Sequence, residues 1–250
     1  MKRRKHSLPL ALLTITALGL VAVTPEGWAR HRDRPVVELG DARLKFEINS
    51  TAQDGGVQVF LDADPWKWMK IFDPNGRLIF RSTVRGSIGK QGGTELFLES
   101  GEPEFSEQSI EELLELFPQG EYRFKGRGLE GEKLVGTAML THSLADGPVL
   151  VSPLEGEGLV DPSNAVVTWE PVEDPNGSPI VGYQVLVVSL ESNFPAIPKI
   201  TLDVMMPATA TSMAVPPGFL LPDTEYEWEV LAIEASGNQT LSSSFFKTAP

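Results

Sequence analysis

Residues able to carry catalysis are scarce in this sequence of 250 residues. There is no cysteine, and the histidines are His6, His31 and His142. A serine-hydrolase triad or a zinc site needs an imidazole or a thiolate placed beside its partners. These histidines are far apart in the sequence, and no motif marks a nucleophilic serine or lysine. We therefore expect no catalytic residue, no cofactor and no enzyme activity.

Carboxylates are plentiful, and one group lies close together: Glu102, Glu104, Glu107, Glu111, Glu112 and Glu115. A glycoside hydrolase needs two carboxyl groups that face each other across a cleft. Three of the group instead fall at i, i+4 and i+8, namely Glu107, Glu111 and Glu115, which is typical of a solvated helix face. The solvated face is the favoured interpretation, and a carboxylate-dependent hydrolase stays as an alternative.

Two further segments suggest ligands, but turns explain them more simply. Asp54, Asp62 and Asp64 flank turns, where an aspartate commonly caps its own backbone, whereas calcium needs several oxygens that converge. We therefore expect no bound metal. If calcium does bind, these three aspartates are the weak candidates for its ligands. Residues 86–93 are glycine-rich and could suggest a phosphate-binding loop. That loop needs a serine or threonine after its lysine and a helix behind it. Here Lys90 precedes a glutamine, and no helix is expected to follow. We expect a flexible connection between strands.

Trp66 and Trp68 carry the best ligand hypothesis in the sequence. Their spacing of two places both indoles on one face of a strand. If that face is exposed, it forms a platform on which sugar rings or a partner's surface could stack. If the face is buried, both residues belong to the core, and this interpretation is favoured because tryptophan is usually buried.

The first 29 residues have the features of a secretory signal peptide. Basic residues from Lys2 to Lys5 precede an apolar run over 8–23, and a small-x-Ala site ends at Ala29. We expect cleavage after Ala29 and export to the periplasm or the outside of a bacterial cell. An uncleaved anchor is the alternative, although the run is short for a membrane-spanning helix. No other stretch is apolar enough to span a bilayer.

The charge balance bears on the class of partner. The chain has 21 basic and 34 acidic residues and a formal net charge of −13, and loss of the basic leader makes it more negative. Such a charge repels nucleic acid and anionic membrane surfaces. We therefore expect no nucleic-acid partner.

Period-two alternation predicts a first β-sandwich over residues 36–142. Strands are expected at 42–50, 57–61, 66–72, 77–84, 94–99, 121–127 and 133–142, with a turn at 62–65 and a hairpin turn at 73–76. One helix is expected over residues 106–117, because apolar residues recur at helical spacing and Ser109 and Glu112 have capping-box spacing. This half is not assigned to a family.

The second half contains a strand that begins just after a Leu-Pro turn. From Glu225 the sequence alternates, with Tyr226 and Trp228 on one face and glutamates on the other. Tyr226 stands where a tyrosine corner is found in immunoglobulin-like sandwiches.

Four motifs, in order and correctly spaced, give the second half a family resemblance. They are Val166-Val167-Thr168-Trp169, Asp174-Pro175-Asn176-Gly177 with the following strand through Tyr183, Leu221-Pro222-Asp223-Thr224-Glu225-Tyr226, and the last turn and strand from Gly237 to Thr248. Residues 148–250 thereby resemble a fibronectin type III domain. The resemblance implies a core that contains Trp169, Tyr183, Leu221, Tyr226 and Trp228. Further strands are expected near 199–205 and 211–215.

The expected fold class is therefore all-β, with two tandem antiparallel sandwiches, the first carrying one inserted helix. The leading functional hypothesis is an exported, non-catalytic binding or assembly module that contacts a protein or glycan partner in the cell envelope. The alternative is a carbohydrate-binding protein that uses Trp66 and Trp68. The sequence does not identify the partner.

The first prediction concerns Trp169. The substitution Trp169→Ala should lower the free energy of unfolding by about 3–5 kcal/mol, because it leaves a cavity in the second core. Chemical denaturation of the variant and the wild type measures this loss. A negligible change would contradict the sandwich assignment.

Overall fold

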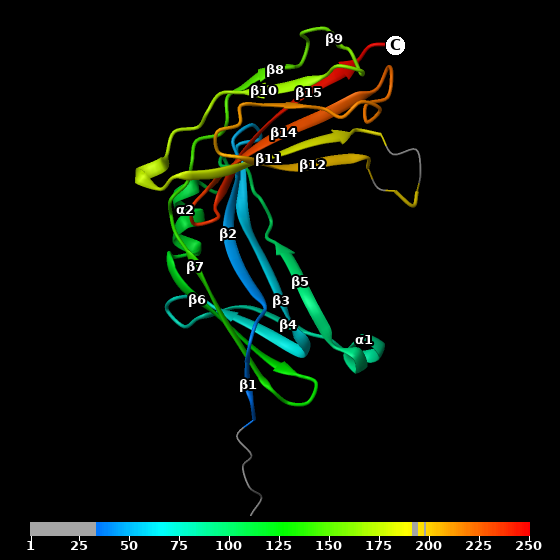
Figure 1. The fold of residues 1–250 in the computed structure, drawn as a ribbon. Coiled ribbons are helices and arrows are strands. Elements are labelled where there is room, and N and C mark those ends of the chain that lie inside the picture. The colour runs from blue at the N-terminus through cyan, green and yellow to red at the C-terminus, as the bar shows by residue number, and fades with distance from the viewer. Residues whose placement is uncertain (1–33, 192–194, 198) are drawn as a thin grey trace, which may run out of the picture. The chain divides into compact units, whose positions relative to one another are not determined.

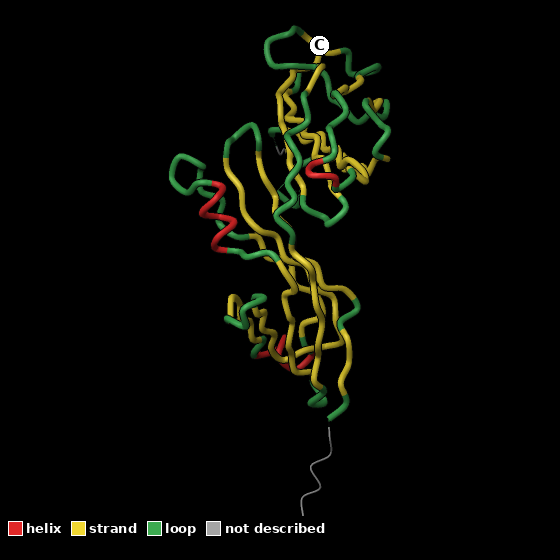
Figure 2. The backbone as a smooth tube through the Cα atoms, turned by 90° about the vertical axis from the view of Figure 1, so that its left-hand side faces the viewer, coloured by secondary structure: helices red, strands yellow, loops and turns green. Residues whose placement is uncertain are grey.

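The computed structural model describes residues 34–250, apart from 192–194 and 198. The expected signal peptide over 1–29 and His31 lie outside these residues. Within them the chain is mostly strand, as the ribbon and tube show (Figures 1 and 2), which confirms the all-β fold class. Arg34–Pro250 forms one compact unit, and two buried clusters lie within it. The division into two tandem domains stays a prediction.

The first half contains seven strands and two short helices. Their bounds are β1 Val36–Glu38, β2 Asp41–Asn49, β3 Asp54–Phe72, β4 Leu78–Thr83, α1 Gly86–Gln91, β5 Gly93–Glu99, α2 Ile110–Leu116, β6 Gly120–Gly128 and β7 Lys133–Leu140.

The long strand β3 belongs to two ladders. Up to Asp62 it pairs with β2 and β5. Trp66 lies between Gly93 of β5 and Gly128 of β6, and from Trp68 onward the strand pairs with β4 and β6. The expected turn at 62–65 was therefore wrong, because this segment bends one strand rather than reversing the chain. Pro65, which has no N–H to donate, lies where the register shifts, so it costs no ladder hydrogen bond.

The bend divides the sheet of the first half into two layers around one core. We call β5–β3–β2 the first layer and β4–β3–β6–β7–β1 the second layer. Alternate residues point inward from both, such as Phe46 and Leu61 from the first, and Ile71 and Phe124 from the second, and all four are buried in one cluster. This arrangement gives each layer its own outer face, formed by the intervening residues of its strands.

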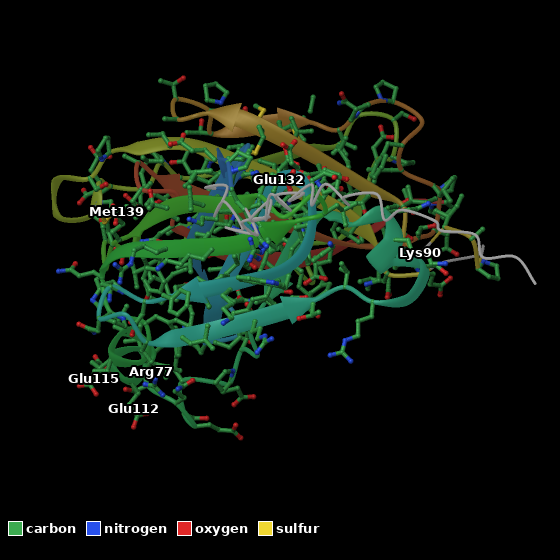
Figure 3. All side chains as sticks on the ribbon, turned by 90° about the horizontal axis from the view of Figure 1, so that it is seen from below. Arg77, Lys90, Glu112, Glu115, Glu132 and Met139 are labelled. Carbon is green, nitrogen blue, oxygen red and sulfur yellow. The ribbon has the colours of Figure 1, made fainter. Side chains whose placement is uncertain are left out.

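Helix α2 is shorter than expected, and α1 was not expected. Ser109 accepts a hydrogen bond from the Glu112 N–H while the Glu112 carboxylate accepts from the Ser109 N–H. This capping box fixes the helix start at Ile110, so residues 106–109 lie outside the helix. Leu113 is buried, and Glu112 and Glu115 lie at the outside of the molecule (Figure 3). The glycine-rich segment forms α1 rather than a loop, and none of its residues is buried.

The second half contains eight strands and one 3-10 turn. Their bounds are β8 Leu150–Ser152, β9 Leu159–Val160, β10 Val166–Trp169, η1 Pro175–Gly177, β11 Ile180–Ser189, β12 Thr201–Pro207, β13 Ser212–Ala214, β14 Glu225–Glu234 and β15 Gln239–Thr248. One layer is β13–β10–β8, and the other runs β12–β11–β14–β15. Trp169, Tyr183, Tyr226 and Trp228 are all buried between them.

Leu221 is an exception to the expected core, because its side chain is 43% exposed. The buried residue of this turn is Leu220. Leu221 contributes its backbone instead, since its N–H donates a 2.9 Å hydrogen bond to the Tyr226 hydroxyl. Tyr122 makes a similar corner in the first half, where its hydroxyl donates to the Pro118 carbonyl at 3.0 Å. Burial raises the pKa of Tyr122 to about 12, so its hydroxyl stays protonated.

Strand β15 joins the two halves by a parallel ladder with β2, in which Gln239, Thr240 and Leu241 lie opposite Glu47, Ile48 and Asn49. One continuous sheet therefore crosses both halves.

Asn238 lies at the start of this ladder and is buried. Its side-chain oxygen accepts from the Phe46 N–H at 2.9 Å, and its amide nitrogen donates to the carbonyls of Thr141 and Ser143 at 3.0 and 2.9 Å. A single amide thus satisfies three backbone groups of the first half.

None of the helices in the described part of the chain is long and apolar enough to cross a membrane.

We expect both tyrosine corners to stabilise the fold to a similar degree. Tyr226→Phe and Tyr122→Phe should each lower the free energy of unfolding by roughly 0.5–1.5 kcal/mol, because each leaves one backbone group without its partner. Denaturant titration of the two single variants measures this, and an unchanged midpoint for both would show that neither hydroxyl bond contributes.

We expect Asn238→Ala to be more costly, by roughly 2–4 kcal/mol, because three buried backbone groups lose their partner together. The substitution Asn75→Ala, at an exposed hairpin tip, is the matched control. Equal midpoints for the two variants would show that Asn238 does not hold the halves together.

Candidate functional site

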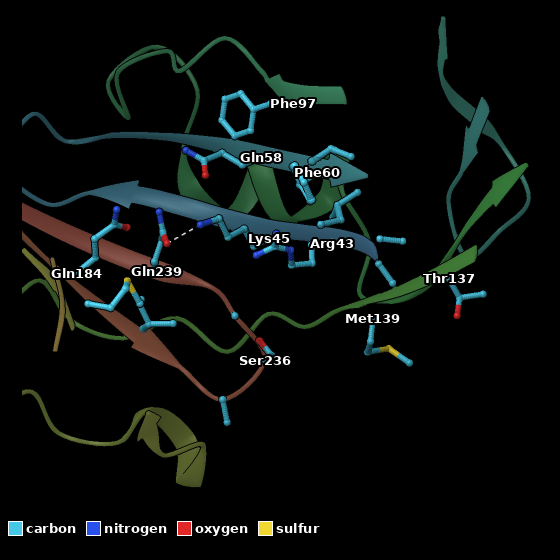
Figure 4. Close-up of a pocket in the computed structure, with 18 residues that line it drawn as sticks. Arg43, Lys45, Gln58, Phe60, Phe97, Thr137, Met139, Gln184, Ser236 and Gln239 are labelled. Atoms are coloured by element: carbon cyan, nitrogen blue, oxygen red, sulfur yellow. Dashed lines mark hydrogen bonds between the residues drawn. The ribbon is translucent and has the colours of Figure 1, made fainter. Parts of the chain in front are cut away.

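A groove of about 770 Å³ lies on the outer face of the continuous sheet (Figure 4). Eighteen residues line it, and they come from both halves. The polar and large apolar side chains among them include Arg43 and Lys45 of β2, Gln58 and Phe60 of β3, Phe97 of β5, Met139 of β7, Gln184 of β11, Met205 of β12 and Gln239 of β15.

Strand alternation explains why these residues face the groove. In β2, Leu44 and Phe46 enter the first core, so Arg43 and Lys45 must point outward. The same argument applies to Gln184, because its neighbours Tyr183 and Val185 are buried in the second core. The groove exists because β2 and β15 pair, which places outward residues of both halves on one surface.

Hydrogen bonds between side chains of β2 and β15 connect the two halves at the floor of the groove. Lys45 Nζ donates to Gln239 Oε1 at 2.6 Å, and Gln239 Nε2 donates to the Glu47 carboxylate. At the sides, Gln58 Nε2 donates to Glu99 Oε1 and Gln184 Nε2 donates to an oxygen of Asp203, each at 2.9 Å. The amides are therefore already oriented, which is the preorganisation that recognition requires.

The two cationic side chains of the groove, Lys45 and Arg43, already interact with other groups of the protein. Burial lowers the pKa of Lys45, and the nearby Glu47 opposes this shift. The Arg43 guanidinium lies 4.6 Å from the centre of the Phe60 ring and pairs with Asp41 at 2.9 Å. Internal contacts of both cations thus reduce the positive charge that they offer to a ligand.

The rim of the groove is apolar and accessible. Phe97, Met139 and Met205 are 60%, 57% and 64% exposed. None of the eighteen lining residues is an aspartate, glutamate or histidine. The groove therefore offers apolar contact and amide hydrogen bonds, but no conventional acid–base pair among its lining residues.

Glu47, Glu99 and Glu102 bring one ligand oxygen each to within 4.8 Å of one another, next to the groove but outside its lining. Burial, together with the charges of Glu99 and Glu47, raises the pKa of Glu102 to about 7. Gln239 and Gln58 already donate to Glu47 and Glu99. Three carboxylates are the donor type that calcium prefers, but amide hydrogen bonds already satisfy two of them, so this cluster carries no metal assignment.

The structure does not bring Asp54, Asp62 and Asp64 together. All three lie on β3, where Asp54 and Asp62 are separated by about 26 Å at 3.3 Å per residue. Of the three carboxylates that do meet, the sequence analysis considered Glu102 but not Glu47 or Glu99, because their contact depends on the pairing of β3 with both β2 and β5.

Trp66 and Trp68 lie in different environments. Trp66 is 2% exposed and belongs to the first core, whereas Trp68 is half-buried on the outer face of the second layer. A register shift between them interrupts the alternation, because a bulge inserts one extra residue. The expected shared face of two indoles was therefore wrong. Lys70 Nζ lies 5.4 Å from the Trp68 ring centre.

His142 has a structural environment. Its Nε2 lies 2.9 Å from the Phe117 carbonyl, and its ring packs against Phe46 at 5.9 Å. It does not line the groove.

Sequence reasoning missed the groove itself. Phe97 and Met205 carried a usable signal, because each is a large apolar residue on the outward face of an alternating strand. Nothing in the sequence indicated that residues near 45 and 239 would meet.

Comparisons with known proteins agree with the fold of the second half. The family model described as "Fibronectin type III domain" matches residues 156–248. No match was found among curated proteins.

Several solved structures are similar at low identity. The fibronectin(III)-like modules of Clostridium thermocellum CbhA are 8% identical, with a TM-score of 0.34 over 84% of this chain and 93% of that chain. The FN1–FN3 domains of chicken CNTN1 are 14% identical, with a TM-score of 0.34 over 87% of this chain and 69% of that chain. A 1.5-MDa bacterial ice-binding adhesin is 14% identical, with a TM-score of 0.26 over 83% and 64%. At these scores the likenesses carry no argument about function.

The carboxylate cluster predicts a pH dependence of stability. A carboxyl group whose pKa is raised in the folded protein binds its proton more tightly there than in the unfolded chain. Its contribution to stability is therefore present at low pH and is lost as the pH rises through about 7. Because Glu102 is exposed, water screens the effect and the slope is shallow.

Glu102→Gln should flatten the decrease in unfolding free energy between pH 5 and 8, measured by denaturant titration. Glu107→Gln, an exposed glutamate of the same segment, is the matched control and should leave the decrease unchanged. If the unfolding free energy depended on pH equally in the wild type and in Glu102→Gln, the raised pKa of Glu102 would be contradicted.

Proposed function

We propose that this chain, in which residues 156–248 form a fibronectin type III domain, is an exported, non-catalytic protein-interaction module. The groove across the two halves is its binding site. The observation that carries the proposal is the combination of a preorganised amide floor with the three exposed apolar side chains of the rim, Phe97, Met139 and Met205.

The chemistry of the groove favours a protein segment. Its volume is within the range of specific ligand sites. Methionine side chains adapt their shape to a partner, and a buried aromatic anchor is a common hot spot of protein interfaces. Amide side chains can pair with the peptide groups of an extended segment. The glycan alternative is weaker, because Trp66 is buried and only Trp68 could stack.

Export is proposed from the sequence alone. The features of residues 1–29 are those of a secretory leader, and the absence of cysteine is compatible with either side of the membrane. Mass spectrometry of the N-terminus of the protein recovered from a host envelope would test cleavage after Ala29.

Site-specific photo-crosslinking tests the groove. A photoreactive residue at Gln184 should capture a defined protein partner, whereas the same residue at Val166, an exposed site on β10, should not. Equal capture at both positions, or capture of glycan only, would contradict a protein-binding groove.

Once a partner is captured, the rim can be tested quantitatively. Phe97→Ser and Met205→Ser should each weaken binding about 5- to 30-fold, because truncation of an interface anchor costs on the order of 1–2 kcal/mol. Val166→Ser is the control. Calorimetric titration of the purified pair measures the change, and unaltered affinity for both rim variants would show that binding occurs elsewhere.

A further inference from the structure

The outer face of the second layer carries a concentration of positive charge that neither the groove nor the fold explains. Its six cations are Lys70 of β3, Arg81 of β4, Arg123, Lys125 and Arg127 of β6, and Lys133 of β7. We call this surface the basic face. These strands lie side by side in the order β7–β6–β3–β4, as the ribbon shows (Figure 1).

The register places these cations directly opposite one another. Lys70 lies opposite Lys125 on one side and opposite Arg81 on the other. In the next row of the sheet, Arg127 lies opposite Lys133. Like charges that face each other across a ladder destabilise a sheet. Arg127 has a contact that offsets this cost, because its Nη1 donates to the Gly131 carbonyl at 2.7 Å, but the Lys70–Lys125 and Lys70–Arg81 pairs remain unfavourable.

The basic face is not neutralised from within. The two ion pairs of the described residues are Arg43–Asp41 and Lys247–Asp223, and neither involves the six cations. Acidic residues lie at the margins of the face. Glu38 lies beside Val135 and Glu121 beside Met139, and Glu38 and Asp41 line a pocket together with Arg123 and Lys125. The centre, around Lys70 and Lys125, has no acidic neighbour in either ladder.

Apolar side chains lie at both outer edges of the face. Val36 of β1 lies beside Lys133 and is 61% exposed, and Leu78 of β4 lies opposite Phe72 and is 45% exposed. Lys125 Nζ lies 5.3 Å from the Phe72 ring centre. Cations with apolar residues at the margin and an indole, Trp68, between them are the composition that binds at a lipid headgroup surface.

We propose that the basic face docks this protein onto an anionic lipid surface. Charge complementarity commits the face to an anionic partner. The exposed apolar edges favour a lipid surface over a soluble polyanion, because only the lipid surface offers an acyl boundary to cover them. The inference does not depend on the groove, because none of the six cations lines it, although strands β3 and β7 contribute to both surfaces.

The negative net charge of the chain does not prevent this docking. At physiological ionic strength the Debye length is about 8 Å, and packed sheets are already about 10 Å apart. Acidic groups that lie behind the second layer are therefore largely screened from a surface in contact with the basic face. The net negative charge predicts repulsion from an anionic membrane surface, but the six clustered cations of the basic face outweigh it where the two surfaces touch.

The test is cosedimentation of the full chain with vesicles, scored as the ratio of binding to phosphatidylglycerol-containing vesicles over pure phosphatidylcholine vesicles. This ratio removes any contribution of the apolar run at 8–23 that is independent of lipid charge. Each cation near an anionic surface contributes about fivefold in partition. The double variant Lys70→Gln/Lys125→Gln should therefore lower the ratio about 25-fold.

The matched control is Lys90→Gln/Lys199→Gln, which removes two exposed lysines outside the basic face and should leave the ratio near that of the wild type. A ratio of one for the wild type, or an equal loss in the control, would overturn the proposal. At low salt the Lys70→Gln/Lys125→Gln variant should unfold no more easily than the wild type, because like-charge repulsion is relieved. Easier unfolding would show that these lysines act in the fold.

A third variant separates lipid from other polyanions. Val36→Ser/Leu78→Ser should lower vesicle binding about tenfold, because it removes apolar area that enters the interface. Retention on a sulfated-polysaccharide column should not change. Strong retention on that column or on DNA, with no preference for anionic vesicles, would assign the basic face to a soluble polyanion and overturn the lipid assignment.

Discussion

The side-chain amide of Asn238 is the interaction on which the arrangement of the two halves depends. It satisfies the Phe46 N–H and the carbonyls of Thr141 and Ser143, so the start of β15 must lie against β2. Neighbouring hydroxyls extend the contact, since Thr141 Oγ1 and Ser236 Oγ lie 2.7 Å apart. Because these groups are buried, each would carry a desolvation cost if the halves separated. One polar cluster therefore fixes a surface to which both halves contribute.

The bend of β3 has an equally direct effect on the first half. It lets one strand serve two layers, and each layer then presents its own outer face. One outer face joins the second half and becomes the groove, with amides and accessible apolar residues. The other collects cations, and its β7 edge also contributes Thr137 and Met139 to the groove. The protein thus presents two chemically distinct surfaces that arise from a single change of direction near Pro65.

The sequence was sufficient where local pattern decides structure. Alternation located most strands, the Ser109–Glu112 spacing identified the helix cap, and the corner at Tyr226 identified the second sandwich. It failed where tertiary pairing overrides local signals. The segment 62–65 has turn composition, but partners on both sides hold it in a strand. The bulge between Trp66 and Trp68 breaks a face that spacing alone predicts, and the groove depends on a ladder between distant strands. Net charge likewise gave no indication that six cations share one face.

The ladder between β2 and β15 also has a kinetic consequence. Its partners, such as Glu47 and Gln239, are separated by 192 positions in the chain, so closing it costs the entropy of a very long loop. Contacts of such sequence separation form slowly, after local structure. During synthesis the first half can collapse early, yet its open strand edge must wait until nearly the whole polypeptide has emerged. Until then that edge is a place where a wrong strand can attach, which makes the final closure the step most exposed to misassembly.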